Sequence, residues 1–352
     1  MAPGGFLPTV AELMRSHNAS QATITQALAR LRQIGLVEHP LGRKRLVVAK
    51  PSERSLHRIA FVRPAYPSPD YDRLLYAIKE AAHRRHWGVD IVSYGEMSNL
   101  NFARVFENSD AALFVPWSEP IPDQMKKAIA SSAKPIICLR EHPPLGLHIR
   151  SVLLDDFEIG RLAATHLVNL GHKRIVALTS EPHSSLSSQR IAGWRSVVEK
   201  SGIGKRSGIL ADCSVKAGTN SIRGSYEKFK VWLRKEREEF SALFCVDWTG
   251  ALAAMRAMRE SGRSIPDDVS LVAFSGEEDL SAFLNPPITT VEIDLGEFAA
   301  RSLEQVEEAL SGKGSGQAAA VRLKPHLEVR ESTRRLAGRR TTASRTRLRA
   351  TG

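Results

Sequence analysis

Short apolar runs alternate with amphipathic stretches over most of the chain, from Arg58 to about residue 330. The runs are rich in β-branched residues, and the stretches between them place apolar residues three or four positions apart. This alternation is typical of parallel β-α-β units. The predicted strands are RIAFV, GVDIVSY, AALFVPW, PIICL, SVLL, RIVALTS, SGILA, ALFCV and VSLVAFS, and the predicted helices are 71–86, 123–132, 158–170, 188–201, 220–237 and 249–261. Nine strands exceed what one six-stranded sheet of this type holds, so we expect two α/β subdomains.

The first 48 residues follow a different pattern. LPTVAELMRSHN places Glu12 three residues after Thr9, which is the spacing of a capping box at a helix start. After the turn Asn18-Ala19-Ser20, with Ser20 as a candidate N-cap, a second helix begins. Its predicted core positions are Ile24, Ala27, Leu28 and Leu31, which leaves Gln21, Ala22, Thr23, Thr25 and Gln26 towards solvent. LVEHPLGRKRLVV then predicts a strand, a basic loop with Gly42 at the turn, and a strand.

The net charge of +12 is confined to the two ends of the chain. Residues 1–50 hold seven basic and two acidic side chains, and residues 330–352 hold eight arginines and one glutamate. The 35 basic and 35 acidic side chains between them balance. A chain whose ends are basic and whose middle part is neutral favours a polyanionic partner. Residues 331–352 lack apolar periodicity, so we expect a disordered basic tail, and the polar segment 49–57 is expected to be a linker.

Several classes of function are disfavoured. No apolar run is long enough to span a membrane, and Met1 to Val10 do not resemble a secretion signal, so we expect a cytoplasmic protein without membrane partners. Cys138, Cys213 and Cys245 are expected to be buried thiols. No CxxC, P-loop, G-x-S-x-G or G-x-G-x-x-G motif occurs, and His183 beside the Ser-rich loop has no recognisable third group. We therefore expect no enzyme, no cofactor and no metal.

The N-terminal stretch LPTVAELM … ASQATITQALARLRQIGLVE resembles the GntR-type winged helix-turn-helix. The family's first helix would precede Pro3, so we expect either an earlier start or a trimmed module. The resemblance implies a second helix that reads the major groove of an operator and a basic wing on phosphates. The alternative is an unrelated helix and hairpin. The implied DNA-contacting residues are Thr9, Ser20, Gln21, Ala22, Thr23, Thr25, Gln26, Arg30, Arg43, Lys44 and Arg45.

Four later motifs resemble the effector domain of the LacI/GalR family: SVLLDDFEIGRLAATHLVNLGHKRIVAL, SSLSSQRIAGWRSVVEKSGI, SALFCVDWTGALAAMRAMRESGRSIPDDVSLVAF and PPITTVEIDLGEFAARSLEQVEEAL. The resemblance implies an α/β fold with two doubly wound subdomains of the periplasmic-binding-protein type I, which dimerise and hold a small effector in the cleft between them. The combination with the N-terminal module is like that of arabinose repressors. The expected domains are a winged helix at 1–48, a linker at 49–57, an effector domain at 58–330 and a tail at 331–352. Within the effector domain, subdomain 1 is expected at 58–153 and 288–312, and subdomain 2 at 154–287 and 313–330.

The same resemblance places candidate effector-binding residues after strand ends. Arg190 matches a sugar-contacting arginine, whose guanidinium can hold two ligand oxygens; the alternative is a structural ion pair. Trp248 follows Asp247 and can stack on a sugar ring, or simply pack in the core. Arg140 and Ser275 stand where the family tends to have aspartates, which leads to the hypothesis of an anionic effector, such as a sugar acid or sugar phosphate. The further candidates are Tyr66, Tyr71 and Trp117.

These observations predict a DNA-binding transcriptional regulator of the repressor kind, controlled by a small sugar-like effector. The expected partners are a double-stranded DNA operator, the effector and a second copy of the chain. The alternative is a soluble sugar-binding protein without DNA-binding activity.

Overall fold

The computed structural model describes residues 5–33, 37–38, 46–48, 56–66, 68–116, 121–143, 147–201, 208–236, 239–274, 278–312 and 320–336. The chain separates into two compact units. One comprises Met1–Arg58 with Ala82–Gly88, and the other comprises Ile59–Ala81 with Val89–Gly352.

The N-terminal unit begins with two helices, α1 (Val10–His17) and α2 (Gln21–Gln33). The predicted capping box is present: Thr9 N–H donates to Glu12 Oε2 over 2.7 Å, and Glu12 N–H donates to Thr9 Oγ1 over 3.3 Å. Asn18 ends α1 in the left-handed conformation, with φ of 48°. Ser20 Oγ accepts from Thr23 N–H over 3.2 Å, as predicted for the N-cap of α2. Polar side chains at these ends satisfy backbone groups that the helices leave unpaired.

A short antiparallel pair of strands follows the two helices. β1 (Val37–Glu38) pairs with β2 (Val47–Val48), and Phe6 forms an isolated bridge to Val47. Val37, Val47 and Ile24 are buried, whereas Ala27, predicted for the core, is exposed. The loop that carries Arg43, Lys44 and Arg45 lies outside the described residues. Few of the described side chains of this small unit are therefore buried.

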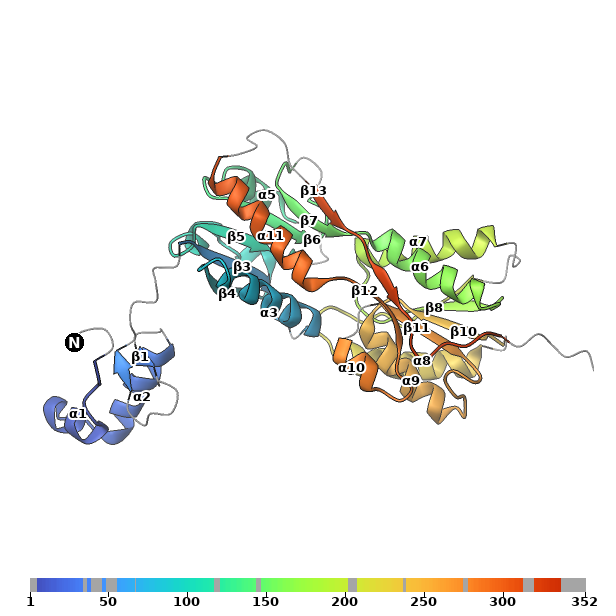
Figure 1. Cartoon of the computed structure of the whole chain (residues 1–352), viewed down its shortest axis with the longest axis horizontal. Helices are drawn as coiled ribbons and strands as arrows, with labels where there is room; N and C mark the ends of the chain where they lie inside the picture. The colour runs from blue at the N-terminus through green and yellow to red at the C-terminus, as the bar shows by residue number, and fades with distance from the viewer. Residues whose placement is uncertain are drawn as a thin grey trace, which may run out of the picture. The chain divides into compact units, whose positions relative to one another are not determined.

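The larger unit contains two six-stranded sheets, each covered by helices on both faces, as predicted (Figure 1). The first sheet has the order β13-β7-β6-β5-β3-β4. Helices α4 and α5 pack on one face through Phe102, Met125 and Ile129, and α11 contacts β5, β6 and β7. Its elements are β3 (Arg58–Pro64), α3 (Pro69–His83), β4 (Gly88–Tyr94), the 3-10 helix η1 (Met97–Asn99), α4 (Phe102–Val105), β5 (Ala111–Phe114), α5 (Asp123–Ala130), β6 (Ile136–Arg140), β7 (Ser151–Leu154), α11 (Leu295–Leu310) and β13 (Ala320–Leu323).

The second sheet has the order β14-β12-β11-β10-β8-β9, in which only β14 runs antiparallel to its neighbour. Helices α8 and α9 pack on one face through Phe229, Ala254 and Met258, while α6 and α7 contact strands of the sheet and each other. Its elements are α6 (Asp156–Asn169), β8 (Ile175–Thr179), α7 (Ser185–Lys200), β9 (Gly208–Asp212), α8 (Ser221–Lys235), β10 (Ala242–Cys245), α9 (Trp248–Glu260), β11 (Ser270–Phe274), α10 (Glu278–Phe283), β12 (Thr289–Glu292) and β14 (His326–Glu328).

The chain passes between the two sheets in three places, and two of them differ from the predicted boundaries. The first crossing follows β7. The second follows β12, which pairs with β11, so residues 288–292 belong to the second subdomain and not to the first. The third follows β13, which pairs with β7, so 320–323 belong to the first subdomain. Asp155 N–H donates to Leu323 O over 3.0 Å, which joins the first and third crossings.

The predicted tail begins too early. Ser332 is fully buried, and its hydroxyl donates to Leu271 O over 2.6 Å. Leu336 N–H donates to Leu170 O over 2.8 Å. Residues 331–336 are therefore part of the second subdomain, because polar side chains and backbone groups, rather than apolar periodicity, hold this segment. Residues 337–352 lie outside the described part of the chain.

Candidate functional site

A cavity of about 500 Å³ lies between the two subdomains of the larger unit. Its walls are the segments that follow strands β3, β5 and β6 of the first sheet and β8, β9, β10 and β11 of the second. Parallel strands bring such segments together at one edge, where loops and helix N-termini offer polar groups. Of the predicted effector residues, six line this cavity, and Trp117 and Ser275 lie outside the described residues. The six are Tyr66, Tyr71, Arg140, Arg190, Asp247 and Trp248.

Arg190, on α7, is held by two carboxylates. Its Nε donates to Asp156 Oδ1 over 2.8 Å, and its Nη1 donates to Asp247 Oδ1 and Val246 O over 3.0 Å each. Its guanidinium also lies 3.9 Å from the centre of the Phe274 ring. Only 4% of the Arg190 side chain is exposed. The alternative of a structural ion pair therefore explains the contacts of Nε and Nη1. Of the three guanidinium nitrogens of Arg190, only Nη2 has no such contact with the described residues and is left for a ligand.

The opposite wall carries a second ion pair and two tyrosines. Arg140 Nη1 lies 3.6 Å from Asp70 Oδ2. Arg140 has a φ of 69°, a left-handed conformation that residues with side chains seldom adopt. The Tyr66 and Tyr71 hydroxyls are 3.0 Å apart. Burial raises the pKa of both tyrosines, so they face the cavity as neutral hydroxyls.

Two further carboxylates face the cavity, and the sequence analysis did not identify either. Glu181 accepts from the Thr249 hydroxyl over 2.7 Å and from the Ser221 hydroxyl over 2.8 Å. Glu141 accepts from the Ser185 hydroxyl over 2.6 Å. Burial raises the pKa of both glutamates. Both residues lie within two positions of a predicted strand end, the same signal that singled out Arg140.

Trp248 packs in the core of the second subdomain and also lines the cavity. Its exposed fraction is 7%, so most of the ring packs against protein. Only a small part of the ring surface is thus accessible to a ligand.

The charges in the cavity bear on the hypothesis of an anionic effector. That hypothesis treated Arg140 and Arg190 as free cations, but each is paired with a carboxylate. Among the described residues, the carboxylates of Asp70, Glu141, Glu181 and Asp247 and these two guanidiniums line the cavity. The described part of the cavity therefore offers a negatively charged ligand no guanidinium without a carboxylate partner.

The N-terminal unit presents the predicted polar face. Gln21, Ala22, Thr23, Thr25 and Gln26 are all exposed at the start of α2. Thr9 and Ser20 are engaged in capping and sit at the helix starts. Arg30 lies on α2, but its side chain is outside the described part of the structure. A helix with a small, polar N-terminal face fits the major groove of DNA.

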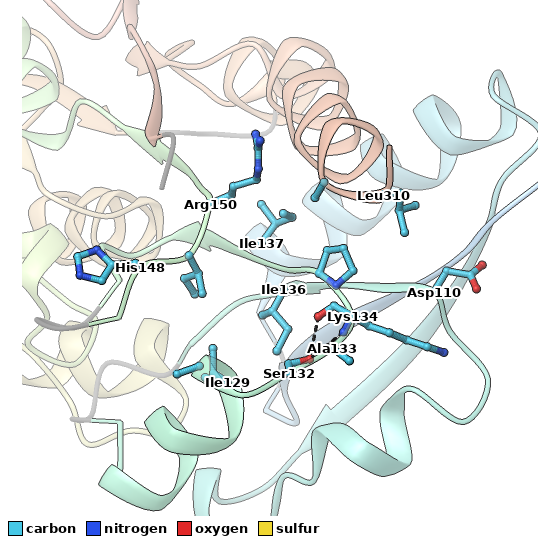
Figure 2. A pocket seen from close by; sticks show the side chains of 14 residues that line it. Asp110, Ile129, Ser132, Ala133, Lys134, Ile136, Ile137, His148, Arg150 and Leu310 are labelled. Atoms are coloured by element: carbon cyan, nitrogen blue, oxygen red, sulfur yellow. Dashed lines mark hydrogen bonds between the residues drawn. The ribbon is translucent and has the colours of Figure 1, made fainter. Parts of the chain in front are cut away.

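A larger hollow, of about 720 Å³, lies at the amino-terminal edge of the first sheet (Figure 2). Lys134, Arg150 and His148 lie apart from one another around it in Figure 2. Lys134 Nζ donates to Phe106 O and Ser109 O, and Arg150 Nη1 donates to Gln305 and Glu308. Because Lys134 and Arg150 are engaged and the three side chains do not converge, this hollow is a weaker site than the cavity between the subdomains.

His183 has neighbours that the sequence did not predict. Its Nε2 lies 3.2 Å from Asp212 Oδ2 and 3.0 Å from the Ser214 hydroxyl. Both contacts involve the same nitrogen, so the ring cannot pass a proton from serine to a base held at its other nitrogen, as a catalytic triad does.

Among the described residues, no group of three His, Cys, Asp or Glu side chains suits a metal ion, and no helix suits a membrane span. The three cysteines are buried, as predicted.

Comparison with known proteins agrees with this architecture. Residues 164–333 match the family model of the periplasmic binding protein-like domain. The chain is 28% identical to the HTH-type transcriptional regulator DegA of Bacillus subtilis over 281 residues, which cover 78% of this chain and 80% of that protein. It is 25% identical to the HTH-type transcriptional repressor PurR of Mannheimia succiniciproducens over 274 residues, covering 77% and 79%. A LacI family transcriptional regulator from Enterococcus faecium, solved with bound ribose, superposes with a TM-score of 0.68 at 21% identity, covering 80% of this chain and 100% of that one.

The fold is thus an α/β fold of two subdomains like that of periplasmic-binding-protein type I, with a cavity between them. The chain's relatives in sequence are HTH-type transcriptional regulators. This combination supports a ligand-controlled, DNA-binding repressor over an enzyme.

Proposed function

We propose that this protein is a cytoplasmic transcriptional repressor that binds an operator as a homodimer and is controlled by a small effector in the cavity between its subdomains. The observation that carries the proposal is the similarity to HTH-type transcriptional regulators along more than three quarters of the chain. The cavity and its polar lining support control by a ligand. The bound ribose of the E. faecium structure supports a sugar-like size.

We further propose that the N-terminal unit is a GntR-type winged helix. Two capped helices followed by the antiparallel pair of β1 and β2 support this finer assignment. The polar face of α2 would enter the major groove, and the loop between β1 and β2 would lie along phosphates. In a two-fold dimer, two such units read an inverted repeat.

Effector control follows from the connection between the subdomains. Three chain segments join them, and residues from both subdomains line the cavity, so a bound ligand favours one relative arrangement of the two. A ligand that binds one arrangement more tightly shifts the equilibrium by its difference in affinity. The repressor then has different DNA affinity in its two states, and the coupling is reciprocal.

Selection from a random duplex pool tests DNA binding, and the triple variant Arg43→Ala/Lys44→Ala/Arg45→Ala tests the wing. We expect an inverted repeat to be enriched. The triple variant should bind it more weakly, with the slope of log K against log salt reduced by about one per lost phosphate contact.

The matched control removes the same charge from the tail, as Arg345→Ala/Arg347→Ala/Arg349→Ala. It should keep most of the affinity for the selected repeat. A wing variant that binds like the unmodified protein would contradict the wing assignment. Failure to enrich any sequence would favour the alternative, a sugar-binding protein without DNA-binding activity.

A further inference from the structure

Among the described residues, Glu181 has no cationic partner, and Glu141 forms no ion pair, although the charges of Arg140 and Arg190 act on it. Glu181 contacts the hydroxyls of Thr249 and Ser221, and Glu141 contacts the hydroxyl of Ser185. A hydroxyl donor satisfies a carboxylate oxygen but leaves its negative charge in place. Burying such a charge without a counter-ion is unfavourable.

The carboxylates from the two subdomains act on one another across the cavity. Burial raises the pKa of Glu181, and the negative charges of Asp247 and Asp70 raise it further. Asp70 comes from α3 of the first subdomain, whereas Glu181 and Asp247 follow strands of the second. The negative charge is therefore concentrated where the two subdomains face each other.

The two guanidiniums do not neutralise this charge. Arg190 forms ion pairs with two aspartates: Asp247, which lines the cavity, and Asp156 on α6. Arg140 is closest to Asp70, at 3.6 Å. Tyr66 and Trp248 add aromatic rings to the lining, and the faces of such rings attract cations.

We propose that the effector is a small hydroxylated molecule that carries a protonated amine, with the ammonium group next to Glu181. This inference rests on the proposed function, because it takes the cavity to be the effector site. The ammonium supplies the missing positive charge, and the neighbouring Ser and Thr hydroxyls and Arg190 Nη2 can bond the ligand's hydroxyls. The same carboxylates repel acidic and phosphorylated ligands, which gives the site its selectivity.

Titration calorimetry of the full-length protein against matched sugars tests the proposal. The amines are D-glucosamine, D-galactosamine and D-mannosamine, and each is compared with its parent hexose and, where available, with its uronic acid. At least one amine should bind about tenfold or more tightly than its neutral parent, as expected for a hydrogen bond to a charged group. The corresponding acid should show no binding.

The variant Glu181→Gln tests the assigned residue. Glutamine keeps the size of the side chain and can bond the Thr249 and Ser221 hydroxyls. We expect the Glu181→Gln variant to lose most of the preference for the amine over the parent hexose. Its thermal unfolding should remain cooperative, which shows that the variant is folded. The control Glu307→Gln changes an exposed carboxylate on α11 and should leave the preference intact.

The outcomes separate this inference from the proposed function. Equal or tighter binding of a neutral or acidic sugar, or no binding of any amine, overturns the amine assignment. In either case, selection of an operator would leave the DNA-binding function standing. An amine preference without any selected DNA sequence would instead support the effector class and contradict the repressor.

Discussion

Replacing Arg190 with methionine is expected to destabilise the protein by about 3–5 kcal/mol, because the change leaves buried carboxylates without their counter-ion. The side chains of Asp156 and Asp247 are 5% and 12% exposed. Methionine fills similar space but donates no hydrogen bond. Denaturant unfolding measures the loss, and the same variant should no longer bind a ligand in the cavity.

The nearby pair of Arg161 and Glu158 on α6 provides the control. Its side chains are 43% and 26% exposed, so Arg161→Met should cost less than about 1 kcal/mol. Arg190→Lys should fall between the two, since lysine keeps the charge but cannot donate to both carboxylates as a planar fork. A loss below about 1 kcal/mol in Arg190→Met would contradict the structural role assigned to this ion pair.

Gly160→Ala is expected to destabilise the protein by about 3 kcal/mol, although alanine favours helices. Helices α6 and α7 touch through their backbones at Gly160 and Gly193. A Cβ on Gly160 would lie 1.8 Å from Arg190 O, and a Cβ on Gly193 would lie 1.9 Å from Phe157 O. Neither contact can be relieved by turning a side chain, so the helices must move apart.

The separation of α6 and α7 also affects the site, since Asp156 and Arg190 sit on these two helices. Gly160→Ala should therefore weaken ligand binding together with stability, as measured by unfolding and calorimetry. The control is Gly95→Ala, where a Cβ meets no atom within 4 Å and the change should be nearly neutral. A stable Gly160→Ala variant would show that the two helices pack less closely than described.

Apolar patterning predicted most of the fold. All nine predicted strands are present, because each has a short apolar run that stands out from its neighbours; seven of them are mostly buried, whereas β4 and β9 are largely half-buried or exposed. β12 was missed because it is polar in sequence. Thr289 and Thr290 are buried there, and Arg330 bonds Thr290 and lies 3.1 Å from Glu292. Periodicity cannot identify a strand whose buried side chains are satisfied by partners forty residues away.

The candidate site was predicted in part. The family resemblance, together with positions after strand ends, identified six residues that the structure gathers around one cavity. The partners of those residues could not be predicted. Arg190 was weighed as a ligand contact or an ion pair, but only the folded chain brings Asp156 and Asp247 to it. The replacement of two family aspartates by Arg140 and Ser275 led to the hypothesis of an anionic effector, and only the folded chain shows that Arg140 and Arg190 are paired with carboxylates.

The most direct test of the account is the effect of the effector on operator affinity. Fluorescence anisotropy should measure the Kd for the selected duplex with and without the amine that binds most tightly in calorimetry. We predict at least a fivefold change in Kd, with the same factor appearing in the ligand's affinity when DNA is saturating, because the coupling is reciprocal. An operator Kd that stays the same at saturating ligand would contradict ligand-controlled repression.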